Sequence, residues 1–328
     1  VRTPRLAGIE TAVELATTGK PVTAARALEK GLIDKVVSGE LLDGAIAFAR
    51  EALNAPLPLP VSERPVEAKD DAFWDAARKD AAKAGHRAPL AALDSIRFAA
   101  SRSFDEAMAH ERQAFLDLRS SDEAAALRAV FFAERAAPRP DFLKGTDPRP
   151  VSTVGVVGGG TMGSGIASAC LSSGFGVVLI ERDGEALSRG IATIEKTFDG
   201  AVKRGKMSED DKATRMAALA ASTDYAALAG CDLVIEAVFE EISVKREVFE
   251  KLNRHCHADA ILATNTSYLD PREIATVLSD TSRFLGLHFF SPANIMKLLE
   301  IVPVPETAPD ALAAAFALAG KLGKIPVR

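Results

Sequence analysis

Three glycines at fixed spacing follow a short apolar run near the middle of this 328-residue chain. Gly158, Gly160 and Gly163 form the pattern G-x-G-x-x-G between the run "VGVVG" and a stretch with helical periodicity. In such a pattern the first glycine allows a tight turn, the second lets a pyrophosphate approach the backbone, and the third lets helix and strand pack closely. The free N–H groups at the start of the helix favour phosphates. The pattern predicts a dinucleotide site; a glycine turn without a ligand is the alternative.

An acid stands where such a site binds the ribose. Glu181 ends the next apolar run, 23 residues after Gly158, close to the spacing expected for the ribose-binding carboxylate. A carboxylate there repels a 2′-phosphate, which favours NAD over NADP. Arg182 could accept that phosphate, so NADP is the alternative.

A histidine and a glutamate in two successive apolar runs could supply a base. His288 lies in "FLGLHFF", and Glu300 follows 12 residues later in "LLEIVPV". General-base catalysis needs a group whose pKa lies near the working pH, which points to histidine. A carboxylate hydrogen-bonded to one ring nitrogen would fix the tautomer of the histidine and favour its protonated form, the imidazolium. Taken singly, the histidine could be a core residue and the glutamate a surface charge.

Alternating apolar runs and helical patterns in residues 151–328 predict the elements that position these side chains. The alternation is typical of an α/β fold with a Rossmann-like, doubly wound, mostly parallel sheet. We expect strands at 154–158, 176–181, 232–238, 260–265, 284–290 and 298–304. The final "LGKIPVR" resembles the start of another strand, so we expect the chain to be an internal piece of a longer protein.

The preceding residues are predicted to form a mainly α-helical segment. Helices are expected over 11–20, stopped by Gly19, over 23–31, stopped by Gly31, and over 40–54, with a short strand at 32–37. Prolines then mark a linker at 55–65.

A helical connector follows the linker, and Ser103 with Glu106 reads as a capping box within it. The predicted domains are residues 1–55, a linker and connector over 56–150, and residues 151–328.

The composition argues against several classes of protein. A net charge of −5 shows no basic surplus for nucleic acid, and no apolar run reaches the roughly 18 residues of a membrane span. Three cysteines make no disulfide framework and fit a reducing, intracellular compartment. His255, Cys256 and His257 are adjacent on a helix end, where side chains diverge, so we predict no metal site.

Four segments in the second half resemble a known family. "GGGTMGSGIA", "DLVIEAVFEEISVK", "ATNTSYL" and "GLHFFSPANIMKLLEIV" are similar to the L-3-hydroxyacyl-CoA dehydrogenases of fatty-acid β-oxidation, over essentially all of 151–328. "AVELATTGKPVTAARALEKGLIDKVV" resembles the last part of a crotonase-fold enoyl-CoA hydratase/isomerase domain. "FDEAMAHERQAFLDLRSSDEAAALRAVFFAER" resembles the helical connector of multifunctional enzymes that fuse the two activities.

The resemblance implies NAD-dependent oxidation of an L-3-hydroxyacyl-CoA to the 3-ketoacyl-CoA. It implies that His288 is the base, that Glu300 orients it, and that Ser267 holds the C3 oxygen, although Ser267 could instead be a loop or cap serine. Ser291 stands where many relatives have asparagine. The implied cofactor positions are Gly158, Gly160, Thr161, Met162, Gly163, Glu181, Glu240, Lys245 and Asn265. For Glu240 and Lys245 the alternative is ordinary charge at a helix start.

The acyl-CoA substrate carries phosphates, and the resemblance places its binding near the helix after the second strand. Lys196, Lys203, Arg204 and Lys206 lie there, with Lys203 as the candidate contact and a solvated helix face as the alternative.

The resemblance also implies parts outside the chain. A hydratase/isomerase site would precede Val1, and a C-terminal dehydrogenase domain would follow Arg328, so the chain is expected to form a homo-oligomer or to pack with that domain. The expected location is cytoplasmic, or peroxisomal or mitochondrial in a eukaryote. The alternatives are a parent hydratase/isomerase activity and a non-catalytic NAD-binding fragment.

Overall fold

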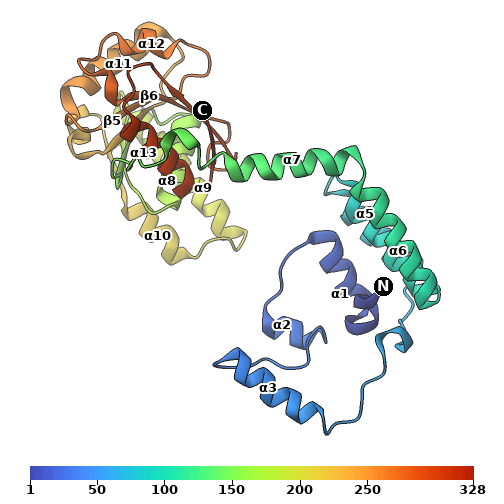
Figure 1. The fold of residues 1–328 in the computed structure, drawn as a ribbon. Coiled ribbons are helices and arrows are strands. Elements are labelled where there is room, and N and C mark those ends of the chain that lie inside the picture. The colour runs from blue at the N-terminus through green and yellow to red at the C-terminus, as the bar shows by residue number, and fades with distance from the viewer. The chain divides into compact units, whose positions relative to one another are not determined.

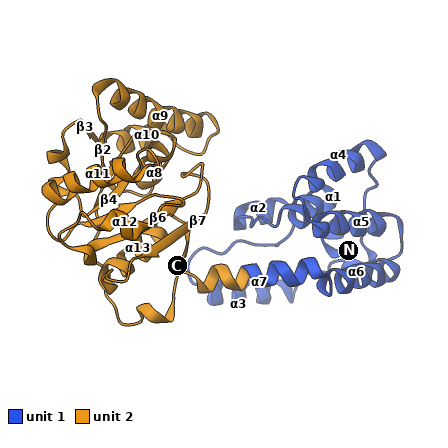
Figure 2. Ribbon diagram, turned by 90° about the horizontal axis from the view of Figure 1, so that it is seen from above, with its two compact units in different colours: residues 1–130 blue, residues 131–328 orange.

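The computed structural model describes all residues from 1 to 328, in two compact units (Figure 2). Unit 1 comprises residues 1–130 and unit 2 residues 131–328. None of the helices combines the length and the hydropathy that crossing a bilayer requires.

Unit 1 is built from helices and contains no strand, so its mainly helical character agrees with the sequence prediction (Figure 1). Its main core lies where α1, α4 and α5 meet, around the buried side chains of Ile9, Trp74 and Leu93. The helices are α1 (Arg2–Thr18), α2 (Ala24–Glu29), α3 (Leu41–Ala52), α4 (Asp71–Ala82), α5 (Arg87–Ser101), α6 (Phe104–Arg119) and α7 (Asp122–Ala136), whose end belongs to unit 2.

Several predicted helix ends are confirmed. α1 ends at Gly19, whose φ of 61° is the left-handed conformation that glycine adopts without strain. Gly31, just after α2, has a φ of 71°. Ser103 and Glu106 form both hydrogen bonds of the capping box at the start of α6.

The strand predicted at 32–37 is wrong. These residues form bends and an irregular segment, because no neighbouring strand offers them backbone partners. Val37 instead packs against α3, where a Cβ added at Gly44 would lie 2.1 Å from a Val37 methyl carbon.

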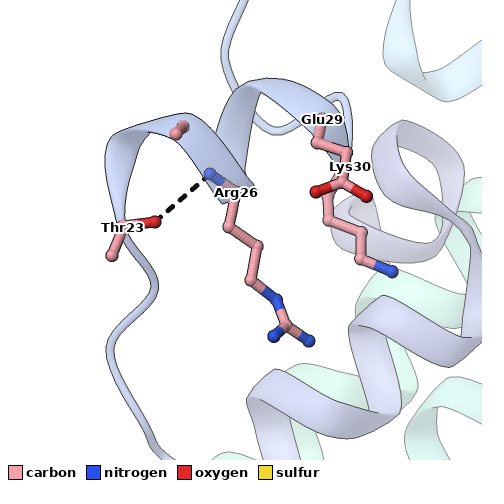
Figure 3. A pocket seen from close by; sticks show the side chains of 5 residues that line it. Thr23, Arg26, Glu29 and Lys30 are labelled. Carbon is pink, nitrogen blue, oxygen red and sulfur yellow. Dashed lines mark hydrogen bonds between the residues drawn. The ribbon is translucent and has the colours of Figure 1, made fainter.

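Unit 1 holds a surface pocket of about 490 Å³ around α2 (Figure 3). The Thr23 hydroxyl accepts a hydrogen bond from the Arg26 N–H, and the Arg26 guanidinium is paired with Glu14. The pocket contains none of the predicted site residues. A larger cavity of about 620 Å³ lies among α1, α5 and α6, also without them.

Unit 2 is an eight-stranded sheet in the order β3-β2-β1-β4-β5-β6-β7-β8. Neighbouring strands are parallel except for β6 and β7. The strands are β1 (Thr153–Val157), β2 (Gly176–Ile180), β3 (Leu219–Ser222), β4 (Leu233–Glu236), β5 (Ile261–Thr264), β6 (Phe284–Phe289), β7 (Leu298–Pro303) and β8 (Ile325–Val327).

Helices cover both faces of this sheet. Alternate residues of β1 and β4 join two separate cores, one packed with α8, α9 and α13 and the other with α11 and α12. These helices, with the short α10, are α8 (Thr161–Ser172), α9 (Gly184–Lys203), α10 (Glu209–Ala217), α11 (Ile242–His255), α12 (Pro271–Ala275) and α13 (Pro309–Lys321). The predicted doubly wound α/β fold is therefore confirmed.

Candidate active site

The predicted residues of unit 2 converge because six strands run in the same direction. Val157 of β1 pairs with Glu236 of β4, which pairs with Thr264 of β5, and Thr264 pairs with Gly286 of β6. The carboxyl ends of β1, β4, β5 and β6 therefore form one edge. The chain reverses its direction of winding between β1 and β4, the point at which such sheets bind ligands.

The glycine turn connects β1 to α8 at this edge. Gly158 has a φ of 98°, and a Cβ there would lie 2.8 Å from the carbonyl oxygen of Ala237. A Cβ at Gly163 would lie 1.7 Å from the carbonyl oxygen of Gly158. These two glycines are therefore required by the packing of the chain itself.

Gly160 differs from them, because a Cβ there would meet no protein atom within 4 Å. It is exposed and caps α8, and no side chain forms a cap hydrogen bond at this helix start. A glycine that packing does not require, at the start of a helix, leaves room for a phosphate group, so the turn fits a dinucleotide.

Glu181 lies beside this turn. Its Oε1 accepts a hydrogen bond from the Gly159 N–H at 2.7 Å, and its Oε2 accepts one from the Arg182 N–H at 3.0 Å. The Arg182 guanidinium is turned to Asp183. The carboxylate is thus fixed at the end of β2, where a ribose would lie.

His288 and Glu300 form the pair that the sequence predicts. They are directly opposed on the antiparallel strands β6 and β7, and His288 Nδ1 lies 2.8 Å from Glu300 Oε2. The imidazole is 16% exposed, and its Nε2 makes no hydrogen bond within the chain. With Nδ1 occupied by the carboxylate, Nε2 is the nitrogen available to a substrate.

A buried ion pair between β4 and α11 stabilises the same edge of the sheet. Lys245 of α11 is 1% exposed and Glu236, at the end of β4, is fully buried; their Nζ and Oε1 atoms are 2.7 Å apart. Thr264 donates to the other oxygen of Glu236 at 2.7 Å. Lys245 also lies 3.0 Å from Glu240 Oε2. It is therefore not an ordinary surface charge at a helix start.

Glu240 extends this network to the loop after β5. Its Oε1 accepts hydrogen bonds from the Thr266 hydroxyl and from the Ser267 N–H at 2.7 Å. Burial alone would raise the pKa of Glu240, but the hydrogen bonds from Thr266, Ser267 and Lys245 together outweigh it, so the pKa is lowered. Glu240 thus carries a negative charge that holds the Ser267 loop in place.

Ser267 is exposed at this edge. The cap of the following helix α12 is Asp270, whose side chain accepts from the Arg272 N–H, so Ser267 is not a cap serine. Asn265 is buried; its Oδ1 accepts from the Phe289 N–H at 2.9 Å, next to His288. Asn265 therefore ties the end of β5 to β6, the strand that carries His288.

The remaining predicted positions have fewer contacts. Thr161 is exposed at the start of α8, Met162 packs partly against the core, and Ser291 is exposed just beyond β6. Lys203 is exposed as the last residue of α9. The side chains contain no group of three or more histidines, cysteines or acids that could hold a metal ion.

Sequence reasoning missed Glu236 and Lys324. Glu236 could have been noticed as the one charge inside the apolar run "LVIEAV", and Lys324 as the one charge inside "LGKIPV". Glu236 is fully buried, and Lys324 is 7% exposed.

Comparison with known proteins matches this domain to a family model. Residues 153–328, more than half of the chain, match the model described as 3-hydroxyacyl-CoA dehydrogenase, NAD binding domain. The chain belongs to the 3-hydroxyacyl-CoA dehydrogenase family. The family and the NAD cofactor predicted from the sequence are therefore confirmed.

Relatives extend the similarity over 99% of the chain. It is 37% identical to the peroxisomal bifunctional enzyme of Cavia porcellus and 33% identical to the fatty acid oxidation complex subunit alpha of Shewanella frigidimarina. The chain spans 46% and 47% of the lengths of these two relatives.

A solved structure supports the same assignment. The 3-hydroxybutyryl-CoA dehydrogenase of Escherichia coli K12 is 40% identical, with a TM-score of 0.54, over 55% of this chain and 38% of that chain.

Proposed function

We propose that the edge around His288 oxidises the C3 hydroxyl of an L-3-hydroxyacyl-CoA to a ketone, as one activity of a multifunctional fatty-acid β-oxidation enzyme. The observation that carries this proposal is the 2.8 Å contact between His288 Nδ1 and Glu300 Oε2. A base with an orienting carboxylate, at the edge of an NAD-binding domain, is what oxidation of an alcohol requires.

Each residue has a defined task in this reaction. Nε2 of His288 accepts the hydroxyl proton as the C3–O single bond becomes a double bond. Glu300 holds Nδ1–H and stabilises the imidazolium that results. Bound NAD supplies the acceptor for the hydride that leaves C3. In the reverse direction, His288 returns the proton to the ketone oxygen.

The other side chains bind and orient. The Ser267 hydroxyl holds the C3 oxygen, a role supported by the hydrogen bond that fixes the Ser267 backbone to Glu240. Ser291 adds a short donor beyond β6. The first N–H groups of α8 and the carboxylate of Glu181 hold the dinucleotide. Lys203 lies at the end of α9, where a phosphate of CoA would meet a positive charge.

The test is NADH oxidation with acetoacetyl-CoA, alongside NADH binding measured by fluorescence. We expect turnover that requires both compounds. NADH binding without turnover would favour a non-catalytic NAD-binding fragment over the proposed activity. Hydration of crotonyl-CoA by this chain would instead favour the hydratase/isomerase alternative.

We also propose an intracellular location, peroxisomal or mitochondrial in a eukaryote. Cys170, Cys231 and Cys256 are all buried and free, which fits a reducing compartment.

We further propose that the edge of the site packs against a further domain or a second copy of the chain. Tyr268 and Ile295, at this edge, are 76% and 69% exposed, and exposed apolar side chains of this kind fit such packing. Sedimentation of the chain will report a second copy directly.

A further inference from the structure

Lys324 is a buried lysine with no task in the reaction above. It lies between α13 and β8, and its side chain is 7% exposed. Its ammonium makes no ion pair; it donates instead to the carbonyl oxygens of Ala293 and Met296, each at 2.7 Å. It also lies 5.5 Å from the ring centroid of Phe289. Burial lowers the pKa of Lys324, so the fold tolerates an unfavourable charge there.

Both carbonyls belong to one loop, residues 290–297. This loop leaves β6 after His288 and Phe289, carries Ser291, and enters the strand that holds Glu300. Ile295 and Met296, which are 69% and 42% exposed, contribute little packing to it. Around these two residues the loop therefore depends on hydrogen bonds for its conformation, beside the packing of the buried Ala293.

Helix α8, which follows the glycine turn, lies against the same loop. A Cβ added at Gly165 of α8 would lie 3.1 Å from the Cβ of Ala293, and Ala293 is 1% exposed. The loop is thus anchored by the ammonium of Lys324 and seated on the helix whose start forms the dinucleotide turn.

We propose that Lys324 is a positioning residue: its buried ammonium fixes the loop 290–297 against α8 and so places Ser291 beside the His288–Glu300 pair. The consequence for substrate binding rests on the proposed dehydrogenase function. The two hydrogen bonds that the ammonium donates to this loop are charge-assisted, and such bonds are stronger than hydrogen bonds between neutral groups. The geometry of the loop does not depend on whether that function is correct.

Amide hydrogen exchange tests the anchoring directly. The N–H groups of Ile295 and Met296 both donate to the Pro292 carbonyl, at 2.9 and 3.0 Å, so they report whether the loop stays closed. Lys324→Met keeps the apolar stem and removes the donors. We expect these two amides to exchange about tenfold faster or more, with the amides of β1 and β4 unchanged.

Matched variants separate anchoring from general destabilisation. Lys324→Arg should restore much of the protection, because a guanidinium can donate to both carbonyls. Lys321→Met, an exposed lysine one turn earlier, should change nothing in the loop. Unchanged exchange in Lys324→Met would overturn the proposal, and so would a rise shared equally by β1 and β4.

Kinetics connect the anchor to the site. In Lys324→Met we expect the KM for acetoacetyl-CoA to rise about tenfold while the KM for NADH stays within about twofold. An equal rise in both would overturn the role in placing Ser291. If the chain without substitutions shows no turnover, the proposed function fails. The amide hydrogen exchange of Lys324→Met still decides whether Lys324 anchors the loop.

Discussion

His288 and Glu300 meet because β6 and β7 run antiparallel in a fixed register. Directly opposed residues have Cβ atoms about 4.5–5.5 Å apart, and these two are such a pair. A slip of one residue would turn the two side chains to opposite faces of the sheet. The pair therefore depends on the register of β6 and β7 as well as on its own contact.

Replacing the base should separate chemistry from cofactor binding. In His288→Gln we expect kcat to fall by about 10²–10⁴-fold, because no group remains to accept the hydroxyl proton. The Kd for NADH should stay within about twofold, since the glycine turn and Glu181 are untouched. NADH oxidation with acetoacetyl-CoA and NADH fluorescence measure the two quantities.

His257→Gln is the matched control, since His257 is exposed and far along the chain from the pair. It should change neither quantity. A parallel loss of turnover and NADH affinity in His288→Gln would show that His288 supports the fold and is not the base.

The sequence predicts part of this site. His288 and Glu300 were recognisable as a pair only within the segments that resemble the dehydrogenases, because each residue taken singly fits a core histidine or a surface charge. The ion pairs of Lys245 with Glu236 and Glu240 could not be predicted, because they form only once α11 packs against the end of β4. The spacing of the three residues in the sequence does not indicate that packing.

The turn between β1 and α8 can be tested as an element, because its glycines have different tasks. Gly160→Ala adds a methyl group where no protein atom lies within 4 Å. We therefore expect an unchanged unfolding midpoint but an NADH affinity at least about tenfold weaker, as the methyl enters the space for the pyrophosphate.

Gly184→Ala is the control for this change. A Cβ at Gly184 also meets nothing within 4 Å, and Gly184 is likewise at a helix start, that of α9, outside the glycine turn. It should leave both the midpoint and NADH affinity unchanged. Unchanged NADH affinity in Gly160→Ala would mean that the dinucleotide does not lie on this turn.

The ion pair between β4 and α11 supports the edge at the scale of two elements. Lys245→Met leaves the fully buried Glu236 without its partner, so the free energy of unfolding should fall by about 3–5 kcal/mol. Adding Glu236→Gln should recover part of the loss, because the uncompensated charge is gone. Urea unfolding of both variants measures this coupling.

Lys251→Met on the same helix removes an exposed pair with Glu247 and a cation–π contact with Tyr225, and it should change the free energy of unfolding by no more than about 2 kcal/mol. A Lys245→Met variant as stable as this control would show that the buried pair contributes no net stability.

Strong periodicity made most elements predictable, and weak periodicity explains the errors. The fully buried β4 and β5 were predicted, whereas β3, with the sequence "LAAS", was missed because it is a short edge strand with two exposed alanines and only one large apolar side chain. The apolar run at 32–37 was assigned to a strand, but an apolar run forms a strand only where another strand pairs with it.

At the scale of the whole molecule, buried thiols and a phenol set the response to alkaline pH. Burial raises the pKa of Cys170 and Cys231 to about 12, that of Cys256 to about 11, and that of Tyr225 to about 12. Above the ordinary thiol pKa of 9.0 the unfolded chain loses these protons first, so stability falls as pH rises. Burial lowers the pKa of Lys324, so this one group makes stability rise with pH, against the four groups that make it fall.

The free energy of unfolding in urea should therefore fall from pH 8 to about 10.5, by up to about 1.4 kcal/mol per pH unit for each thiol, and the urea midpoint should fall with it. Cys170→Ala should reduce that slope, whatever its effect at pH 7. An unchanged midpoint across this range would show that the thiols titrate alike in both states.

The two units have separate cores, and every residue assigned to the site lies in the second. Residues 138–149 belong with that unit: Phe142 packs edge-on against Phe316, and Arg149 binds Asp310 through two hydrogen bonds of 2.9 and 3.2 Å. We therefore expect residues 138–328, which begin just after α7, to fold alone and to bind NADH with a Kd within about twofold of the whole chain.

A shorter piece, residues 151–328, isolates the contribution of that lead-in segment. It lacks Phe142 and Arg149 but keeps the entire sheet, so it should melt at a lower temperature while its NADH affinity stays close to that of the longer piece. Fluorescence titration and thermal unfolding of the two pieces measure this difference. If residues 138–328 were insoluble, or lost NADH affinity while the whole chain kept it, unit 1 would be required for the dinucleotide site, and the assignment of the cofactor to unit 2 alone would be wrong.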